Sequence, residues 1–109
     1  MLSVQQLQEC AAEVAREFLA LDYEELSARA AEVRRGVVDF SGWRTWGGRE
    51  VFVDVQVGRP GWLRRRVGVE VMVSDSDDDE RSSKTKSACV YFERLKNGGL
   101  RGPWPRIAH

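Results

Sequence analysis

Two valine-rich segments in the middle of the chain alternate apolar and polar residues. VFVDVQV (51–57) and VGVEVMV (67–73) place valine at every second position. Alternation with a period of two is typical of β-strands that bury one face. The connection between them, GRPGWLRRR, contains the turn-forming residues Pro60 and Gly61. The two segments are therefore predicted to form a β-hairpin.

The valines also restrict how these two strands pair, because residues directly opposite each other point to the same face of the sheet. With a loop spanning residues 58–62, Val53 lies opposite Val67, and Asp54 lies opposite Arg66. Sliding the strands by two residues places Gln56 opposite Arg66 instead, whereas a slip by one would turn the valines to water and is excluded. The second face of the sheet, opposite the valines, then carries Phe52, Asp54, Gln56, Arg64, Arg66, Glu70 and Met72.

The N-terminal part of the chain follows a helical pattern. Apolar residues recur at spacings of three and four from Val4 to Leu21, which is typical of a helix with one buried face. Ser3 and Gln6 form a capping box that predicts the start of this helix. A helix over residues 4–20 is expected, and its apolar stripe is too short to indicate a coiled coil. We expect this stripe to pack on the sheet.

The helical pattern changes register at Asp22. Asp22 and Glu25 form a second capping box, and Gly36 is a natural C-terminal stop. These residues predict a second helix over residues 23–35, or a single helix that bends between Leu21 and Asp22.

Two further strands are predicted on either side of the hairpin. Residues 37–40 are expected to form a short first strand that ends before Gly42. Residues 88–95 are expected to pair antiparallel with the second valine segment. Trp43 and Trp46 are placed in the loop after the short strand, where they either cap the open end of the core or line a binding site.

The connection over residues 74–87, SDSDDDERSSKTKS, contains no apolar residue and is expected to be a mobile loop. The tail, residues 96–109, has Pro103 and Pro105 on either side of Trp104. Because proline lacks a backbone N–H, no regular structure is expected there. The apolar residues of the tail are expected to dock back on the sheet.

The acidic part of the connection partly matches a calcium-binding loop. Asp75, Asp77 and Asp79 have the spacing of the first ligands in an EF-hand. Glu80 and Lys86 stand where that loop requires glycine and glutamate. Calcium, or any other metal, is therefore not expected.

These elements predict a single α+β domain over residues 1–109. An N-terminal layer of one or two helices (4–35) packs on an antiparallel sheet of three or four strands (37–95), and an extended tail (96–109) follows. This order of elements resembles the cystatin-like and SnoaL-like rolls, in which a helix lies in the curl of an antiparallel sheet. The resemblance lies in architecture, and it implies no particular residues.

Composition and charge narrow the classes of protein. The 17 basic and 17 acidic residues balance, so net charge gives no argument for nucleic acid or a membrane. Charges of one sign are grouped along the chain, which predicts either an acidic helical side and a basic sheet side or internal pairing. Neither a spanning segment nor a signal peptide is recognisable, so a cytoplasmic location is expected. Cys10 and Cys89 are expected to be reduced and buried.

Few residues are suited to catalysis. The single histidine, His109, is the last residue, and no glycine-rich phosphate loop is present. Carboxylates on neighbouring strands, Asp54, Glu70 and Glu93, with Tyr91 nearby, are the remaining catalytic candidates, and such groups beside arginines are usually ion pairs. An enzyme is not favoured, and no cofactor is expected.

The sequence therefore predicts a small protein-binding, adaptor or inhibitory module that acts through the second face of the sheet and the hairpin loop. One alternative is a cystatin-like or SnoaL-like pocket protein that acts on a small molecule. Another is nucleic-acid binding through the loop tryptophans and the arginine-rich middle segment, whose arginines are Arg34, Arg35, Arg44, Arg49 and Arg64. The expected partner is another protein, and a second copy paired through a sheet edge is left open. The candidate binding residues are Trp43, Trp46, Asp54, Trp62, Arg64, Arg66, Glu70 and Tyr91.

Overall fold

The computed structural model describes residues 3–32, 38–58, 66–75 and 87–106. In this part of the chain two helices precede five strands. The elements are α1 (Val4–Leu19), α2 (Tyr23–Glu32), β1 (Val38–Trp46), β2 (Arg49–Gly58), β3 (Arg66–Ser74), β4 (Ser87–Leu95) and β5 (Leu100–Arg106). Each strand pairs antiparallel with the next, so the sheet is a meander of order β1-β2-β3-β4-β5 that does not close into a barrel.

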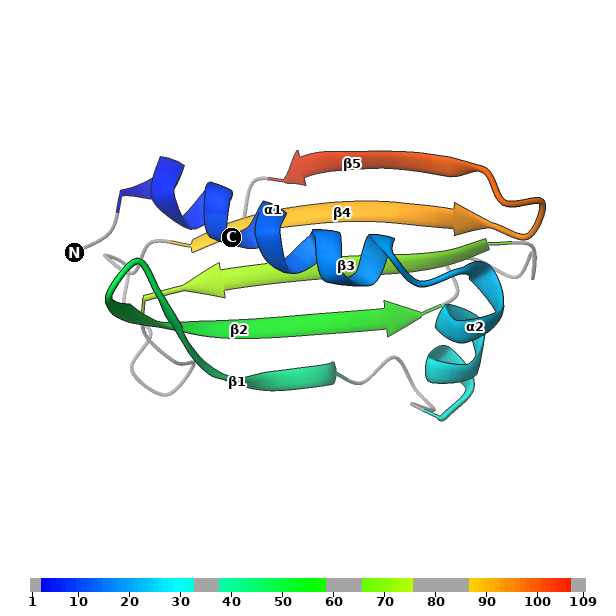
Figure 1. Cartoon of the computed structure of the whole chain (residues 1–109), viewed down its shortest axis with the longest axis horizontal. Helices are drawn as coiled ribbons and strands as arrows, with labels where there is room; N and C mark the ends of the chain where they lie inside the picture. The colour runs from blue at the N-terminus through cyan, green and yellow to red at the C-terminus, as the bar shows by residue number, and fades with distance from the viewer. Residues whose placement is uncertain (1–2, 33–37, 59–65, 76–86, 107–109) are drawn as a thin grey trace.

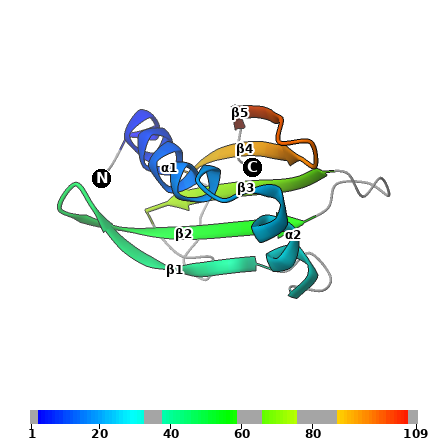
Figure 2. The same ribbon diagram turned by 45° about the vertical axis from the view of Figure 1, so that its right-hand side comes forward.

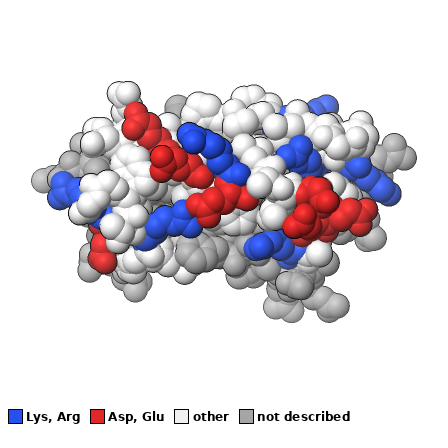
Figure 3. Space-filling model, in the orientation of Figure 1, with Lys and Arg blue, Asp and Glu red and all other residues white. Residues whose placement is uncertain are grey.

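Both helices lie on one face of the sheet (Figure 1, Figure 2). α1 crosses β3 and β4, and α2 packs near one end of the sheet against β2, β3 and β4. The outer side of this helical layer carries interspersed acidic and basic side chains (Figure 3). The charges thus do not divide into a purely acidic helical side.

Side chains fix the position of α1 at both ends. The predicted capping box is present, since the Ser3 hydroxyl accepts from the Gln6 N–H and the Gln6 side chain accepts from the Ser3 N–H. Arg94 of β4 donates from Nη2 to the Leu19 carbonyl oxygen at 2.7 Å, which satisfies an acceptor at the end of α1. Gln8 donates from Nε2 to the Cys89 carbonyl oxygen at 3.0 Å. These bonds tie α1 to β4.

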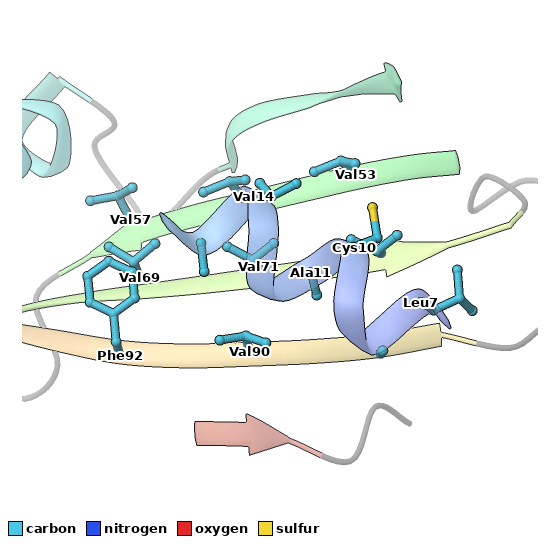
Figure 4. Packing of buried hydrophobic residues seen from close by; sticks show 14 of the residues in the cluster. Leu7, Cys10, Ala11, Val14, Val53, Val57, Val69, Val71, Val90 and Phe92 are labelled. Carbon is cyan, nitrogen blue, oxygen red and sulfur yellow. The ribbon is translucent and has the colours of Figure 1, made fainter. Parts of the chain in front are cut away.

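The core lies between the helices and the valine face of the sheet (Figure 4). Leu7, Ala11 and Val14 of α1 point toward this face, and their spacing matches the predicted apolar stripe. Among the described residues, the largest fully buried side chain is Phe92 of β4. The fully buried valines of the described sheet are Val51, Val53, Val55 and Val57 of β2 and Val67, Val69, Val71 and Val73 of β3.

The predicted α+β class and the packing of helices on the valine face are confirmed, and the sheet has five strands instead of three or four. β3 and β4 pair as expected, with Val71 opposite Val90. The helices end near the predicted positions, at Leu19 and Glu32. The expected stop at Gly36 lies outside the described residues.

The predicted hairpin register is wrong. Val53 lies opposite Val73, and Asp54 lies opposite Met72, so Asp54 does not face Arg66. The alternative register is wrong as well, because Gln56 lies opposite Glu70. The strands are separated by residues 59–65, a longer connection than the one assumed. The shift is an even number of residues, so it leaves the valines on the buried face.

Two segments predicted as irregular are strands. Trp43 and Trp46 lie in β1, and Gly42, expected to interrupt the first strand, pairs with Val53. The tail forms β5 despite its prolines, because an edge strand needs N–H donors on one side only. A register shift beside Gly102, where φ is +87°, accommodates the irregular part of this strand.

Both cysteines are free and buried, as predicted. Cys10 is a residue of α1 and lies in the core. Burial is the main cause that raises the pKa of its thiol to about 11. This thiol is therefore neutral near pH 7. Among the described residues, no helix is long and apolar enough to cross a membrane.

Candidate binding surface

The sheet face that points away from the helices is called here the open face. Its members follow from the strand register, because paired residues point to the same side. Gln56 lies opposite Glu70, and Glu70 lies opposite Tyr91. At the two edges, Trp43 pairs with Phe52, and Trp104 pairs with Tyr91. The open face also contains Asp54, Arg66, Gly68, Met72, Ser74, Cys89 and Glu93.

An exposed tryptophan stands at each edge of the open face. Trp43 on β1 is 47% exposed, and Trp104 on β5 is 46% exposed. Each contacts an aromatic ring on the neighbouring strand: the Trp43 and Phe52 centroids are 5.4 Å apart in an edge-to-face arrangement. Trp104 and Tyr91 are stacked with centroids 6.2 Å apart and an interplanar angle of 14°. Both tryptophans are therefore held in place while part of each ring faces solvent.

Tyr91, Glu93 and Arg66 form a polar network near the β5 side of the open face. The Tyr91 hydroxyl donates to Glu93 Oε2 at 2.7 Å, and Arg66 Nη1 lies 3.5 Å from Glu93 Oε1. Glu93 is buried, whereas Arg66 is partly exposed. Two donors to one buried carboxylate indicate a structural role for Glu93 as a hydrogen-bond acceptor.

Gly68 makes room for this network. A Cβ atom at Gly68 would lie 2.6 Å from Tyr91 Oη and 3.1 Å from Tyr91 Cε1. The Tyr91 ring thus lies across β3 over a position without a side chain, which is how its hydroxyl reaches Glu93. In sheets, an aromatic ring often covers a glycine on the next strand in this way.

The structure brings some of the predicted binding residues together. Tyr91, Glu70 and Arg66 lie on the open face near Trp104, and Trp43 lies at its opposite edge. The predicted partners of Arg66 were wrong, because it lies opposite Leu95 and contacts Glu93. Asp54 is on the open face but is only 8% exposed. The predicted residues Trp62 and Arg64 lie outside the described residues.

Two assignments from the sequence differ from the structure. Trp46 points to the opposite face, where its indole Nε1 donates to Glu13 of α1 at 2.5 Å. It anchors the β1–β2 hairpin to the helix and is not part of the open face. Trp104 was not among the candidates because the tail was expected to be irregular and to dock its apolar residues back on the sheet. The prolines of GPWPR exclude only a central strand, because proline within a sheet is confined to edge strands, first residues and bulges.

The catalytic candidates from the sequence, Asp54, Glu70, Tyr91 and Glu93, all lie on the open face. Among the described residues, no group of three or more His, Cys, Asp or Glu side chains is placed to hold a metal ion. The calcium-like spacing falls mostly within residues 76–86, outside the described part. Glu93 already accepts from Tyr91 and Arg66, so this carboxylate is engaged in a structural network.

On the helix side, one ion pair joins β1 to α1. Arg44 donates from Nη1 to Glu17 Oε2 at 2.5 Å and from Nη2 to Glu17 Oε1 at 3.2 Å. The hydrogen bonds from Arg44 lower the pKa of Glu17 below its ordinary value of 4.5, and the same bonds raise the pKa of Arg44. This bidentate pair holds the edge strand β1 against the helical layer.

The Glu17–Arg44 pair predicts a pH dependence of stability. Because the folded-state pKa of Glu17 is lowered, the contribution is present above pH 4.5 and is lost as pH falls through the lowered value. Glu17 is 55% exposed, so we expect at most about 1 kcal/mol. Urea denaturation at pH 7 and at pH 3 measures it. Glu17→Gln should reduce the difference between the two pH values, and an unchanged difference would contradict the assignment.

Comparisons with known proteins leave the open face to be interpreted from its own chemistry. No family model, curated protein or solved structure matches the chain. The resemblance to cystatin-like and SnoaL-like rolls therefore still rests on the order of helix and strands.

Proposed function

We propose that this protein is a non-catalytic binding module that engages another protein through the open face of its sheet. The observation that supports this most directly is the pair of half-exposed tryptophans, Trp43 and Trp104, on one face of the sheet. Tryptophan, tyrosine and arginine are enriched among the residues that dominate binding energy at protein interfaces. The open face presents all three types.

The rigidity of the surface favours this function. Trp43 leans on Phe52, and Trp104 is stacked on Tyr91, whose hydroxyl is fixed by Glu93. Side chains that are already ordered lose less conformational entropy on binding. Gln56 and Glu70, between the two edges, would supply hydrogen bonds around the aromatic contacts.

The two alternatives have less support. A small-molecule pocket with Asp54 or Glu70 in it would have to form on the open face, because the opposite face is filled by the helices and the valines. For nucleic acid, one of the proposed arginines, Arg44, is engaged with Glu17. Arg34, Arg35 and Arg64 lie outside the described residues, and Arg49, at the start of β2, is exposed.

Truncation of Trp104 tests the proposed function. We expect Trp104→Ala to weaken binding to a partner captured with the wild-type protein at least tenfold, because a buried tryptophan anchor typically contributes about 2 kcal/mol or more. Titration of the purified partner, followed by calorimetry, measures the change. Trp43→Ala is expected to act in the same direction.

Leu100→Ala is the matched control. Leu100 lies on β5 like Trp104 and is 42% exposed, but it pairs with Arg94, whose side chain extends to the helix side. Its truncation should leave the affinity unchanged. Equal losses for Leu100→Ala and Trp104→Ala, or no loss for either tryptophan, would refute binding through the open face.

A further inference from the structure

The outer edge of β1 carries backbone groups that are available for pairing. Within the described chain, β1 is at the end of the sheet and pairs with β2 alone. Gly47 and Gly48, with φ of +58° and +78°, form a two-residue hairpin turn, so the flanking pair Trp46 and Arg49 is hydrogen-bonded. Hydrogen-bonded and non-bonded pairs then alternate along the ladder. The residues whose N–H and C=O point outward are Ser41, Trp43 and Thr45.

The other edge of the sheet is protected. β5 contains Pro103 and Pro105, which have no N–H to donate, and its register is irregular beside Gly102. Prolines and bulges at an edge prevent the addition of another strand. Ser41, Trp43 and Thr45 of β1 are all exposed, and none of them is proline or charged. Of the two edges, β1 is the one that can accept a strand.

We infer that two copies of this chain pair antiparallel through β1, about a two-fold axis at Trp43. In this register Trp43 lies opposite Trp43 of the second copy, and Ser41 lies opposite Thr45 of the second copy. The outward N–H and C=O groups of all three residues then have partners in both chains. A shift by two residues in either direction would remove one of the three pairs.

The side chains of β1 suit this register. On the open face, the two Trp43 rings, each 47% exposed, become neighbours and cover one another. On the helix side, Arg44 lies opposite Gly42 of the second copy, which has no side chain to obstruct it. Each Arg44 also carries its own Glu17 carboxylate at 2.5 Å, so the two arginines approach without an unbalanced charge.

The pairing is closed and modest in size. An isologous contact of β1 with β1 gives one ten-stranded sheet, and the prolines of β5 prevent growth into a filament. One strand pair and two tryptophans bury less than the roughly 1,200 Å² of a standard interface, so a weak dimer in the micromolar range is expected. The inference rests on the edge of β1, and it shares Trp43, but not Trp104, with the binding surface of the proposed function.

Cysteine cross-linking tests the register. Ser41→Cys and Thr45→Cys proteins, mixed and mildly oxidised, are expected to form a disulfide-linked heterodimer, because a hydrogen-bonded antiparallel pair has Cα atoms about 5.5 Å apart. Each variant alone should stay monomeric on a non-reducing gel, since its own cysteines are four residues out of register. The native cysteines, Cys10 and Cys89, are buried and should give little background.

Sedimentation equilibrium provides the second measurement. Wild type is expected to dimerise with increasing concentration, and Thr45→Pro, which removes an outward N–H, should weaken the dimer at least tenfold. Thr45→Val keeps the N–H and should dimerise like wild type. A monomer throughout the range up to about 0.5 mM, an unaffected Thr45→Pro dimer, or self-cross-linking of Thr45→Cys as efficient as that of the mixture would overturn the inference. Loss of partner binding in Trp104→Ala with the dimer intact would separate this result from the proposed function.

Discussion

Replacement of Phe92 by alanine is expected to lower the free energy of unfolding by about 3–5 kcal/mol. Phe92 is the largest of the fully buried side chains and lies opposite Val69 on the valine face. Its ring fills space between β4 and the helical layer, so truncation removes apolar contacts and leaves a cavity that the neighbouring strands close only in part. Urea denaturation followed by tryptophan fluorescence measures this loss.

Phe92→Leu is the control for this substitution. Leucine keeps most of the apolar volume and should cost less than about 1.5 kcal/mol. Trp104→Ala, on the exposed face, should change stability by less than either core variant because the ring is already 46% exposed. A loss below about 1 kcal/mol for Phe92→Ala would contradict a tightly packed core at this position.

The alternation of valines was sufficient to predict which face of β2 and β3 is buried. Alternation carries information on the face because side chains point to opposite sides with a period of two. Alternation carries no information on the register, because sliding one strand along the other by two residues leaves the same face buried. Val53 can face Val67 or Val73 with the same side buried, and in the structure it faces Val73. The face was therefore predictable, and the register was not.

The full extent of the two edge strands, β1 and β5, was not predicted, for a different reason. β1 contains Gly42, and β5 contains Pro103 and Pro105, and these residue types weaken a strand pattern. An edge strand tolerates them because only one of its sides needs hydrogen-bond partners and part of its surface stays in water. Trp43 and Trp104 lie on these two strands. Trp43 was a candidate from the sequence, whereas Trp104 was assigned to an irregular tail and was missed.

The polar network of Tyr91, Glu93 and Arg66 depends on a contact between strands that no local sequence pattern reveals. Gly68 and Glu93 are directly opposite on β3 and β4, and Tyr91 reaches over Gly68 to Glu93 on its own strand. In the sequence, Gly68 is a weak point in a valine strand. In the fold, it is the position that orients Tyr91 under Trp104.

Gly68→Ala is expected to lower the free energy of unfolding by about 1–3 kcal/mol, which is the range for overpacking at a buried site. A Cβ atom 2.6 Å from Tyr91 Oη forces the ring to move. The hydroxyl then loses its bond to Glu93, and the stacking on Trp104 is disturbed. Urea denaturation gives the stability, and near-ultraviolet circular dichroism reports the changed aromatic environment.

A double-mutant cycle with Tyr91→Ala separates this clash from an effect on β3 itself. Without the Tyr91 ring, the added Cβ has room, and alanine is the better strand residue by about 0.5–1 kcal/mol. Gly68→Ala should therefore be neutral or stabilising in the Tyr91→Ala background, although it destabilises the wild type. If the substitution is equally destabilising in both backgrounds, the glycine is required by the backbone of β3, and Tyr91 is held over it for another reason.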